Sequence, residues 1–449
     1  MTVIELGDVS GTGRDGPEPD PAGRPAPRSI RRRLAVAVAL AGVLLLGAAA
    51  PPGVPLVHEL WWAPFDDESS MTVRNGTVYV QKATTDGSVM TAYDLVTGDR
   101  RWKRATTGQA SWMAVTGAGG VLLIAGAPVS TNVSYGDGSL AVQLSASELT
   151  ALDEATGEPL WRAEGEMQAV SGDTVLLGDQ DEAGHLTALR SIGLRTGSPR
   201  WERRITPAEV IATPDDGGDG PERIVTATAD GRVTVFDAVD GTPLLARRVS
   251  WIERQPGEGL GTILRIAGDK LLVTRTDRRG GTITAYRLDT LDELWNTSAN
   301  RQAVVQPCGP VLCLSNGGEV DGIDPATGAL RWRGAGWAGA ESLGGGRLLA
   351  YDNGQEPHQT LLDAATGRPI GAGDGVGYPI WPDAATGALL LVRALAEPGG
   401  RTVVTRLDLT TGRADPMGTV GTAEGINCRG TDRYLACQDD DRLIVTAVG

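Results

Sequence analysis

The sequence predicts an all-β protein, a β-propeller of four-stranded antiparallel blades. The first observation is a phrase that returns along the chain, as LDEATGEPLWR at 152–162 and IDPATGALRWR at 323–333. The second is the spacing of eight such phrases, which lie about 45 residues apart, the length of one propeller blade. Their first-Asp positions are 94, 153, 193 (a Gly here), 237, 289, 324, 363 and 408. The third is a strand pattern upstream of the phrases.

Apolar, alternating stretches precede the phrases and predict the inner strands of each unit. Examples are TVYVQK at 77–82, TVLLGDQ at 174–180, KLLVTRT at 270–276 and RLLAYDN at 347–353. They are rich in β-branched residues and bounded by Gly and Asp, as strands are. No sustained helical period follows residue 50, so we expect few helices in that part of the chain.

Each phrase predicts a tight hairpin followed by an outer strand. The Asp side chain can accept backbone N–H bonds two residues on, and the Gly supplies a positive φ angle. The Trp falls on the outgoing strand, where we expect it to pack against the neighbouring sheet rather than stack on a cofactor. The copies at 363 and 408 have lost the Trp. The residues to which we assign this structural role are Asp94, Gly98, Trp102, Asp153, Gly157, Trp161, Gly197, Trp201, Asp324, Gly328 and Trp332.

The Asp-x-x-Thr-Gly-x-x-x-Trp phrase resembles the repeat of the PQQ-type (quinoprotein-like) β-propeller superfamily, over residues 58–449. That family contains quinoprotein dehydrogenases and cofactor-free scaffold proteins, so the fold does not determine the function. The eight-bladed form usual in the family implies eight blades here. Three strands at 425–430, 433–438 and 442–448 and one at 59–65 form a ninth set. We expect these two ends to pair and close the ring, one weak unit to be irregular or merged, and region 127–150 to be an elaborated loop.

The N-terminal region predicts a membrane anchor. Residues 1–33 have the composition of a disordered cytoplasmic tail and end in three arginines. Residues 34–50 are apolar and just long enough for a transmembrane helix, a signal anchor with its N-terminus inside. Residues 51–449 would then be the extracytoplasmic propeller of a single-pass cell-membrane protein. The alternative is a cleavable signal peptide that ends at Ala48–Ala50.

Cysteine usage and charge agree with export. The four cysteines form two local pairs, Cys308 with Cys313 and Cys428 with Cys437, each flanking a predicted hairpin turn. We predict both as disulfides, because cross-strand neighbours can meet the required distances. A zinc site is the weaker alternative, since the three histidines are scattered.

After residue 33 the chain carries 35 basic and 51 acidic residues, which argues against nucleic acid as a partner. The scarcity of lysine suggests a bacterial source.

Motifs for catalysis and cofactor binding are weak. Quinoprotein dehydrogenases are characterised by adjacent cysteines and long inserted loops, and this chain has neither, so we expect no enzyme and no cofactor. The acidic runs at 215–220 and 439–441 lack the ligand spacing of a calcium loop and predict turns. The glycines at 117–120 and 344–346 also predict turns, because no Lys-Ser/Thr follows them.

We therefore expect a membrane-anchored protein-binding or scaffolding module with an unknown protein or cell-envelope partner. The scaffold subunit of outer-membrane protein assembly provides the analogy within the family. Candidate surfaces are the loop at 134–137 and the tryptophans outside the phrase, Trp112, Trp251, Trp337 and Trp381, if they are exposed rather than core. A PQQ-dependent oxidoreductase and a ligand-binding sensor are the alternatives.

Overall fold

The computed structural model describes residues 56–449, except 86, 107–115, 135–139, 215–222, 254–259, 355, 372–374, 383–386, 396–399 and 422–426. The chain divides into two compact units, Met1–Pro55 and Leu56–Gly449, and the described residues belong to the second. The predicted tail (1–33) and transmembrane helix (34–50) lie outside the described residues and remain predictions. Within the described part of the chain, we find no helix with the length and apolar character needed to span a membrane.

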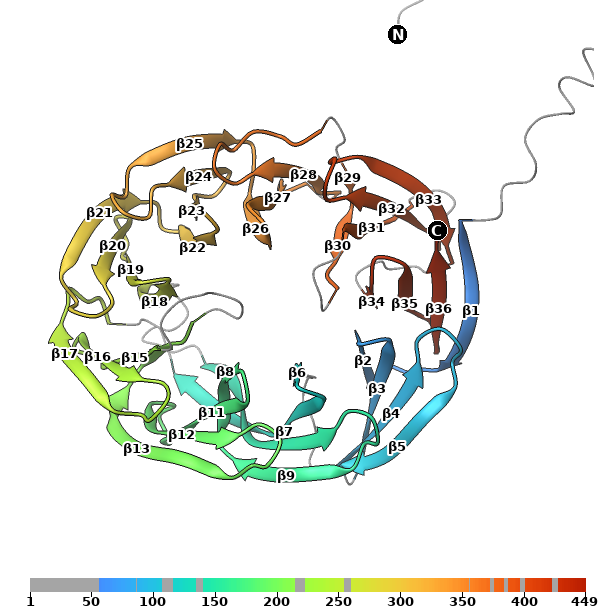
Figure 1. Cartoon of the computed structure of the whole chain (residues 1–449), viewed down its shortest axis with the longest axis horizontal. Coiled ribbons are helices and arrows are strands. Elements are labelled where there is room, and N and C mark those ends of the chain that lie inside the picture. Colours follow the sequence, from blue (N-terminus) through green and yellow to red (C-terminus); the bar gives the residue numbers. More distant parts are fainter. Residues whose placement is uncertain are drawn as a thin grey trace, which may run out of the picture. The chain divides into compact units, whose positions relative to one another are not determined.

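The second unit is a ring of nine four-stranded antiparallel sheets, or blades (Figure 1). The prediction of eight blades, with one unit irregular or merged, is therefore wrong. Each of the eight phrases belongs to a blade of its own, and the strands at the two chain ends build the ninth. The ninth blade combines β34, β35 and β36 with β1 from the other end of the ring, so no phrase connects its third and fourth strands. All elements among the described residues are strands.

We number the blades in chain order, and within each blade the strands pair in chain order from the innermost to the rim. Blade 1 contains β2 (Ser69–Arg74), β3 (Thr77–Thr84), β4 (Gly87–Asp94) and β5 (Arg100–Thr106). Blade 2 contains β6 (Thr116–Ala118), β7 (Val121–Ser134), β8 (Leu140–Asp153) and β9 (Pro159–Glu164). Blade 3 contains β10 (Glu166–Ser171), β11 (Thr174–Gln180), β12 (Leu186–Gly193) and β13 (Pro199–Ala208). Blade 4 contains β14 (Val210–Ala212), β15 (Arg223–Ala227), β16 (Arg232–Asp237) and β17 (Pro243–Arg248).

The second half of the ring follows the same plan. Blade 5 contains β18 (Gly261–Ala267), β19 (Lys270–Thr276), β20 (Gly281–Arg287) and β21 (Glu293–Ala299). Blade 6 contains β22 (Val304–Cys308), β23 (Val311–Ser315), β24 (Glu319–Ile323) and β25 (Leu330–Ala335). Blade 7 contains β26 (Gly339–Gly344), β27 (Arg347–Tyr351), β28 (His358–Asp363) and β29 (Gly375–Val376). Blade 8 contains β30 (Tyr378–Ile380), β31 (Ala388–Ala394), β32 (Thr402–Asp408) and β33 (Ala414–Val420).

Blade 9 joins the two ends of the ring, as predicted. Its first three strands are β34 (Cys428–Gly430), β35 (Tyr434–Asp439) and β36 (Arg442–Val448), and its outer strand is β1 (Val57–Pro64). β1 pairs antiparallel with β36, from Val57 opposite Val448 to Pro64 opposite Arg442. The N–H of Gly449 also donates to the carbonyl of Leu56 (2.6 Å). This pairing covers the β36 edge, which would otherwise be open to other strands.

The Asp of the phrase closes the hairpin turn between the third and fourth strands. In blade 1, the Oδ1 atom of Asp94 accepts bonds from the N–H groups of Val96 (2.9 Å) and Thr97 (3.0 Å). Gly98 adopts a φ of +74° and donates its N–H to the Asp94 carbonyl (3.0 Å). Asp153, Asp324 and Asp408 cap their turns in the same way.

The Trp of the phrase packs on the turn of the following blade. Trp102 donates its indole N–H to the carbonyl of Glu154 (3.1 Å), and a Cβ on Gly157 would lie 2.5 Å from its ring. Gly is therefore required at the turn for two reasons, its positive φ and this close approach. The same contact joins six pairs of neighbouring blades, through Trp61–Gly98, Trp102–Gly157, Trp161–Gly197, Trp201–Gly241, Trp295–Gly328 and Trp332–Gly367.

The copy of the phrase in blade 5 departs from the pattern. The first position predicted for this copy, Asp289, is wrong by two residues. The turn is closed by bonds from the Arg287 N–H to the Asp292 carbonyl and from the Leu291 N–H to the Arg287 carbonyl (2.9 and 2.8 Å). Arg287, not Asp289, therefore occupies the first position of this copy. Leu291 takes the place of the Gly with a φ of +54°. The preceding blade carries Leu245 in place of the Trp, and both leucines belong to one apolar cluster.

The remaining structural predictions concern the disulfides and the elaborated region. Both disulfides form, Cys308–Cys313 across the β22–β23 turn and Cys428–Cys437 between partner residues of β34 and β35. Residues 127–134 and 140–150 of the predicted elaborated loop lie instead on the paired strands β7 and β8, and residues 135–139 lie outside the described residues. The core lies between the blades, in clusters such as Met90, Trp102, Leu122 and Leu152, which joins blades 1 and 2.

Candidate functional site

The antiparallel blades give the ring two different faces. One face, the hairpin face, carries the turns between strands one and two and between strands three and four of each blade. The other, the connector face, carries the loops between strands two and three and the segments that lead to the next blade. Leu56 and Gly449 both lie on the hairpin face, because they replace the last hairpin turn of blade 9. The repeat residues serve the hairpin face, which leaves the connector face as the candidate place for a binding site.

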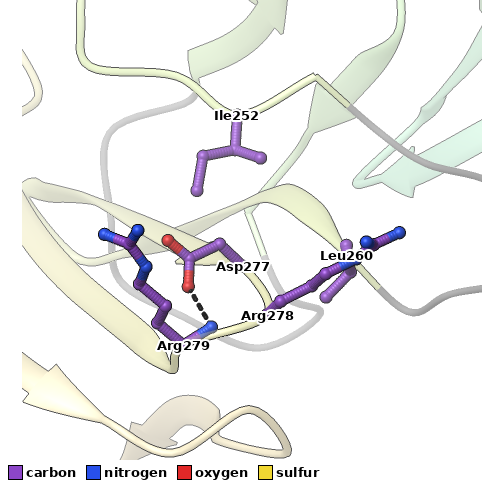
Figure 2. A pocket seen from close by; sticks show the side chains of 5 residues that line it. All are labelled: Ile252, Leu260, Asp277, Arg278 and Arg279. Atoms are coloured by element: carbon purple, nitrogen blue, oxygen red, sulfur yellow. Dashed lines mark hydrogen bonds between the residues drawn. The ribbon is translucent and has the colours of Figure 1, made fainter.

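A hollow of about 430 Å³ opens on the connector face at blade 5 (Figure 2). It lies between the segment that leads from blade 4 to blade 5 and the loop that joins β19 to β20. Its lining residues are Ile252, Leu260, Asp277, Arg278 and Arg279. We call it the blade-5 pocket.

The arginine side of the pocket is a tight turn held by Asp277. Its Oδ1 atom accepts bonds from the N–H groups of Arg279 (2.7 Å) and Gly280 (3.0 Å). The Asp277 N–H in turn donates to the Gly280 carbonyl (2.9 Å). These bonds place Arg278 and Arg279 at the exposed tip of the hairpin. Asp277 therefore acts first as a turn residue that positions two arginines.

The opposite side of the pocket is apolar and anchored to the innermost strand of blade 5. The buried hydroxyl of Thr262 accepts the N–H of Ile252 (2.9 Å) and donates to the carbonyl of the same residue (2.9 Å). Leu260 is buried just before β18 begins. Ile252 is thus held in place by a side chain of the sheet, which gives the pocket one firm wall.

The pocket lies in a basic part of an acidic protein. At the pocket, residues 275–279 contain three Arg and one Asp, whereas the whole chain has a net charge of −15. Part of this charge is structural, since Arg275 donates to the Thr284 hydroxyl (3.4 Å). Guanidinium groups bind carboxylate and phosphate oxygens in paired, planar geometry. The pocket is therefore suited to an anionic group with an apolar neighbour.

The wall of the central opening next to the pocket combines apolar and charged side chains. Ile263 (64% exposed) and Val304 (50% exposed) lie toward the connector face on the innermost strands of blades 5 and 6. Deeper along neighbouring innermost strands follow Arg265, Gln306 and Glu341. Burial raises the pKa of Glu341, and the charge of Arg265 and a hydrogen bond from Gln306 oppose that rise. An apolar rim and a polar interior thus adjoin the blade-5 pocket.

A second hollow, of about 260 Å³, lies between blades 8 and 9, with Thr419, Arg442 and Ile444 in its lining. The phrase of blade 8 has Pro416 where blades 1, 2, 3, 5 and 6 have Trp, so no indole fills this junction. Trp62, which pairs with Ile444 across β1 and β36, is 55% exposed. The closure of the ring is therefore less completely packed than the junctions that hold a Trp.

The tryptophans and the loop predicted as candidate binding surfaces differ in their exposure. Trp251 and Trp337 are half-buried and pack against apolar clusters, whereas Trp381 is 46% exposed in the first loop of blade 8. Trp112 and residues 135–137 of the predicted loop lie outside the described residues, as does the acidic run 215–220.

The remaining acidic and glycine runs form turns, as predicted. Asp440 and Asp441 make the turn between β35, which ends at Asp439, and β36, and Asp440 adopts a φ of +52°. Residues 344–346 make the turn between β26 and β27.

Sequence reasoning missed the blade-5 pocket. It treated the segment 270–276 only as a strand and did not weigh the Asp-Arg-Arg-Gly that follows it. The signal that was available is the local excess of basic residues in a chain of opposite net charge. Without the fold, nothing in the sequence places Ile252 and Leu260 beside that turn, because they precede it by a whole hairpin.

Comparison with known proteins gives a family and a fold. A family model described as outer membrane protein assembly factor BamB matches residues 58–167, 125–219, 145–306 and 212–344, which together cover more than half of the chain. Overlapping matches of one model are typical of a repeat protein. No curated protein sequence matches this chain significantly.

The solved structures that resemble this chain are distant from it in sequence. BamB from Moraxella catarrhalis is 14% identical, with 87% of this chain and 99% of that chain covered and a TM-score of 0.42. A europium-containing methanol dehydrogenase is 15% identical, with 88% and 94% covered and a TM-score of 0.41. A eukaryotic initiation factor is 10% identical, with 84% and 89% covered and a TM-score of 0.53. The last likeness supports the propeller fold and nothing more.

Proposed function

Because this chain belongs to the family of outer membrane protein assembly factor BamB, within the PQQ-type β-propellers, we propose that it is a protein-binding scaffold that catalyses no reaction. We further propose that residues 34–50 anchor it in the cell membrane with the propeller on the extracytoplasmic side. The ring is a rigid disc, since Trp contacts and apolar clusters join its blades. Such a disc presents loops in fixed positions, which is what a scaffold requires.

The observation that carries the proposal is the composition of the connector face around blade 5. Exposed apolar side chains, Ile263 and Val304, lie next to a pocket that has two arginines at its edge. Protein interfaces combine an apolar centre with a polar rim, and arginine is enriched in them. We therefore place the partner on the connector face.

Two features support the proposed location. Residues 34–50 are apolar and follow Arg31–Arg33, the charge arrangement of an anchor whose N-terminus is cytoplasmic. The two disulfides within the ring suit an oxidising compartment outside the cytoplasm.

Photo-crosslinking in the cells that produce the protein tests the binding face. A crosslinking amino acid is introduced at Ile263 on the connector face and, as a control, at Thr366 on the hairpin face. We expect one defined protein partner to be captured from Ile263 and not from Thr366. Capture only from Thr366, or from neither position, would overturn the proposed binding face.

Topology is tested with a maleimide that does not cross membranes. Ser171, exposed on the hairpin face, and Ser10, in the predicted tail, are replaced one at a time by cysteine. We expect Ser171→Cys to be labelled in intact cells and Ser10→Cys only after lysis. Labelling of Ser10→Cys in intact cells would contradict the proposed anchor orientation.

Catalysis is tested by incubating the purified protein with PQQ and Ca²⁺ and following cofactor absorbance and dye-linked oxidation of alcohols and sugars. We expect neither a bound-cofactor spectrum nor turnover. Clear turnover would replace the scaffold with a PQQ-dependent oxidoreductase, the competing function within the superfamily.

A further inference from the structure

We infer that the blade-5 pocket binds an extended segment of the partner protein through a carboxylate side chain, next to an apolar side chain of the same segment. This inference rests on the proposed function and names the chemistry that the connector face recognises. It assigns the carboxylate to Arg279 and the apolar side chain to Ile252.

The first step of the argument is charge. Beyond the pocket the chain is strongly acidic, so an acidic partner is repelled by most of the molecule and attracted only where basic residues gather. Residues 275–279 are such a place, with three Arg and one Asp, and Arg278 and Arg279 are exposed there. Complementary charge therefore both selects an acidic segment and fixes where it binds.

The second step is geometry. Figure 2 shows the side chains of Arg278 and Arg279 leaving the turn in opposite directions, with Ile252 across the hollow. One oxygen of Asp277 accepts two backbone N–H bonds, so this carboxylate holds the turn while the arginines remain at its tip. Arg279 thus presents a guanidinium beside an open hollow of about 430 Å³. That volume lies in the range of pockets that hold small ligands, and a few residues of an extended segment fit it.

The third step is the apolar wall, which distinguishes a peptide from a free anion. Phosphate or sulfate would use Arg279 and leave the half-buried Ile252 side chain uncovered. An acidic residue next to an apolar one uses both sides of the pocket, and Ile263 and Val304 extend the apolar surface beyond it. Thr262 holds the Ile252 backbone, so this wall is ready before the segment binds. Preorganisation of this kind favours binding.

The test uses the full chain and two fluorescein-labelled, end-capped peptides, Gly-Leu-Glu-Leu-Gly and its Gln analogue, measured by fluorescence polarisation. We expect the Glu peptide to bind about tenfold more tightly than the Gln peptide, the value of one good charged contact. Arg279→Glu should abolish this preference, and Arg279→Lys should retain part of it. Arg368→Glu, an exposed arginine on the hairpin face, is the matched control and should leave it unchanged. Added salt should weaken the preference, because both groups are solvent-accessible.

Several results would overturn the inference. These are equal binding of the two peptides, binding of neither, a preference that survives Arg279→Glu, or inorganic phosphate that binds the wild type more tightly than the Glu peptide. The failure of this inference is distinguishable from that of the proposed function. If the crosslink at Ile263 forms while the peptides show no acid preference, only the ligand chemistry is wrong. If that crosslink is absent too, the binding face itself is wrong.

Discussion

At the scale of single residues, the aspartate of the phrase in blades 1 and 6 performs two tasks with its two oxygens. In blade 1, Oδ1 of Asp94 closes the turn, while Oδ2 pairs with Arg101 (2.7 Å). Blade 6 repeats the arrangement, with Arg331 pairing with Asp324 (2.5 Å). The hydrogen bond from Arg101, followed by the bond from the Thr97 N–H, lowers the pKa of Asp94 to about 2. The turn is thus stabilised by a carboxylate in its charged form.

This lowered pKa predicts how acid affects the blade 1 turn. A depressed folded-state pKa means that the ionised Asp94 stabilises the fold above its unfolded pKa, about 4, and that this stabilisation is lost as the pH falls from about 4 to about 2. Asp94→Asn keeps an oxygen for the turn but loses the charge. We expect it to lower the free energy of unfolding by about 1 kcal/mol at pH 7. Denaturant titrations of both proteins should show the difference shrinking below pH 4.

The control for Asp94 is Val96→Ala in the same turn, whose exposed side chain does not titrate. Its effect on the free energy of unfolding should be the same at pH 7 and at pH 3. A difference between Asp94→Asn and the wild type that stays constant down to pH 2 would contradict the role of the charge.

The blade 4–5 junction gives a second prediction at this scale. Leu245→Trp alone places a larger side chain against Leu291 and should cost about 1–3 kcal/mol. Leu291→Gly alone removes a buried side chain and should cost a similar amount, although it relieves the strain of a positive φ. Together they recreate the Trp–Gly contact of six other junctions. We therefore expect the free energy of unfolding of the double variant to be at least about 1 kcal/mol higher than the summed effects of the two single variants predict. A double-mutant cycle measures this coupling, and strict additivity would refute it.

At the scale of elements, each outer strand secures the next blade rather than its own. The Trp of β5, β9, β13, β21 and β25 lies on the fourth strand of one sheet and contacts the turn of the next. Where the Trp is missing, the backbone approaches directly, since a Cβ on Gly412 would lie 1.8 Å from the Ile370 carbonyl oxygen. The phrase is therefore a device for joining blades, and its loss in blade 7 changes how that joint is made.

This role predicts different outcomes for two tryptophans. Trp102→Ala removes a buried wedge between blades 1 and 2 and should lower the free energy of unfolding by about 3–5 kcal/mol. Trp62→Ala removes an exposed ring on β1 and should change it by less than about 1 kcal/mol. Denaturant unfolding of both variants measures the contrast. Equal effects would show that burial at the junction is not what makes Trp102 important.

At the scale of the whole molecule, ring closure depends on a strand from the opposite end of the chain. β1 supplies both the outer strand of blade 9 and Trp61, which contacts Gly98 of blade 1 and donates to the Leu95 carbonyl (3.0 Å). The two ends are therefore joined by backbone pairing on one side and by a Trp contact on the other.

Removal of β1 should open the ring. Deletion of residues 56–64 exposes the β36 edge and removes the Trp61 contact, so we expect lower thermal stability and concentration-dependent association through that edge. Trp61→Ala, which keeps the strand, should lower stability without association. Light scattering and thermal unfolding distinguish the two variants. A monomeric deletion variant with an unchanged midpoint would show that β1 does not close the ring.

Much of the architecture follows from local patterns in the sequence. The turn needs Asp and Gly at set positions, a strand needs alternating apolar and polar residues, and the contact between blades needs a large aromatic side chain. The pattern formed by Asp153, Gly157 and Trp161 therefore predicts a blade wherever it recurs. The disulfides follow because Cys428 and Cys437 flank one hairpin. The copy in blade 5 was misaligned because Leu291 adopts the backbone conformation usually reserved for Gly, which residue types alone do not reveal.

The sequence by itself determined the repeat, the strands and the local disulfides, because each depends on residues that are close in the chain or on a recurring pattern. It also predicted that the two chain ends pair, because each end carries part of an incomplete blade. Only the tertiary structure decided that there are nine blades, since the ninth forms from two ends that no phrase connects. It also decided that each Trp contacts the following blade and that Ile252 lies opposite Arg279. These are contacts between separate elements, and they form only when neighbouring blades pack together.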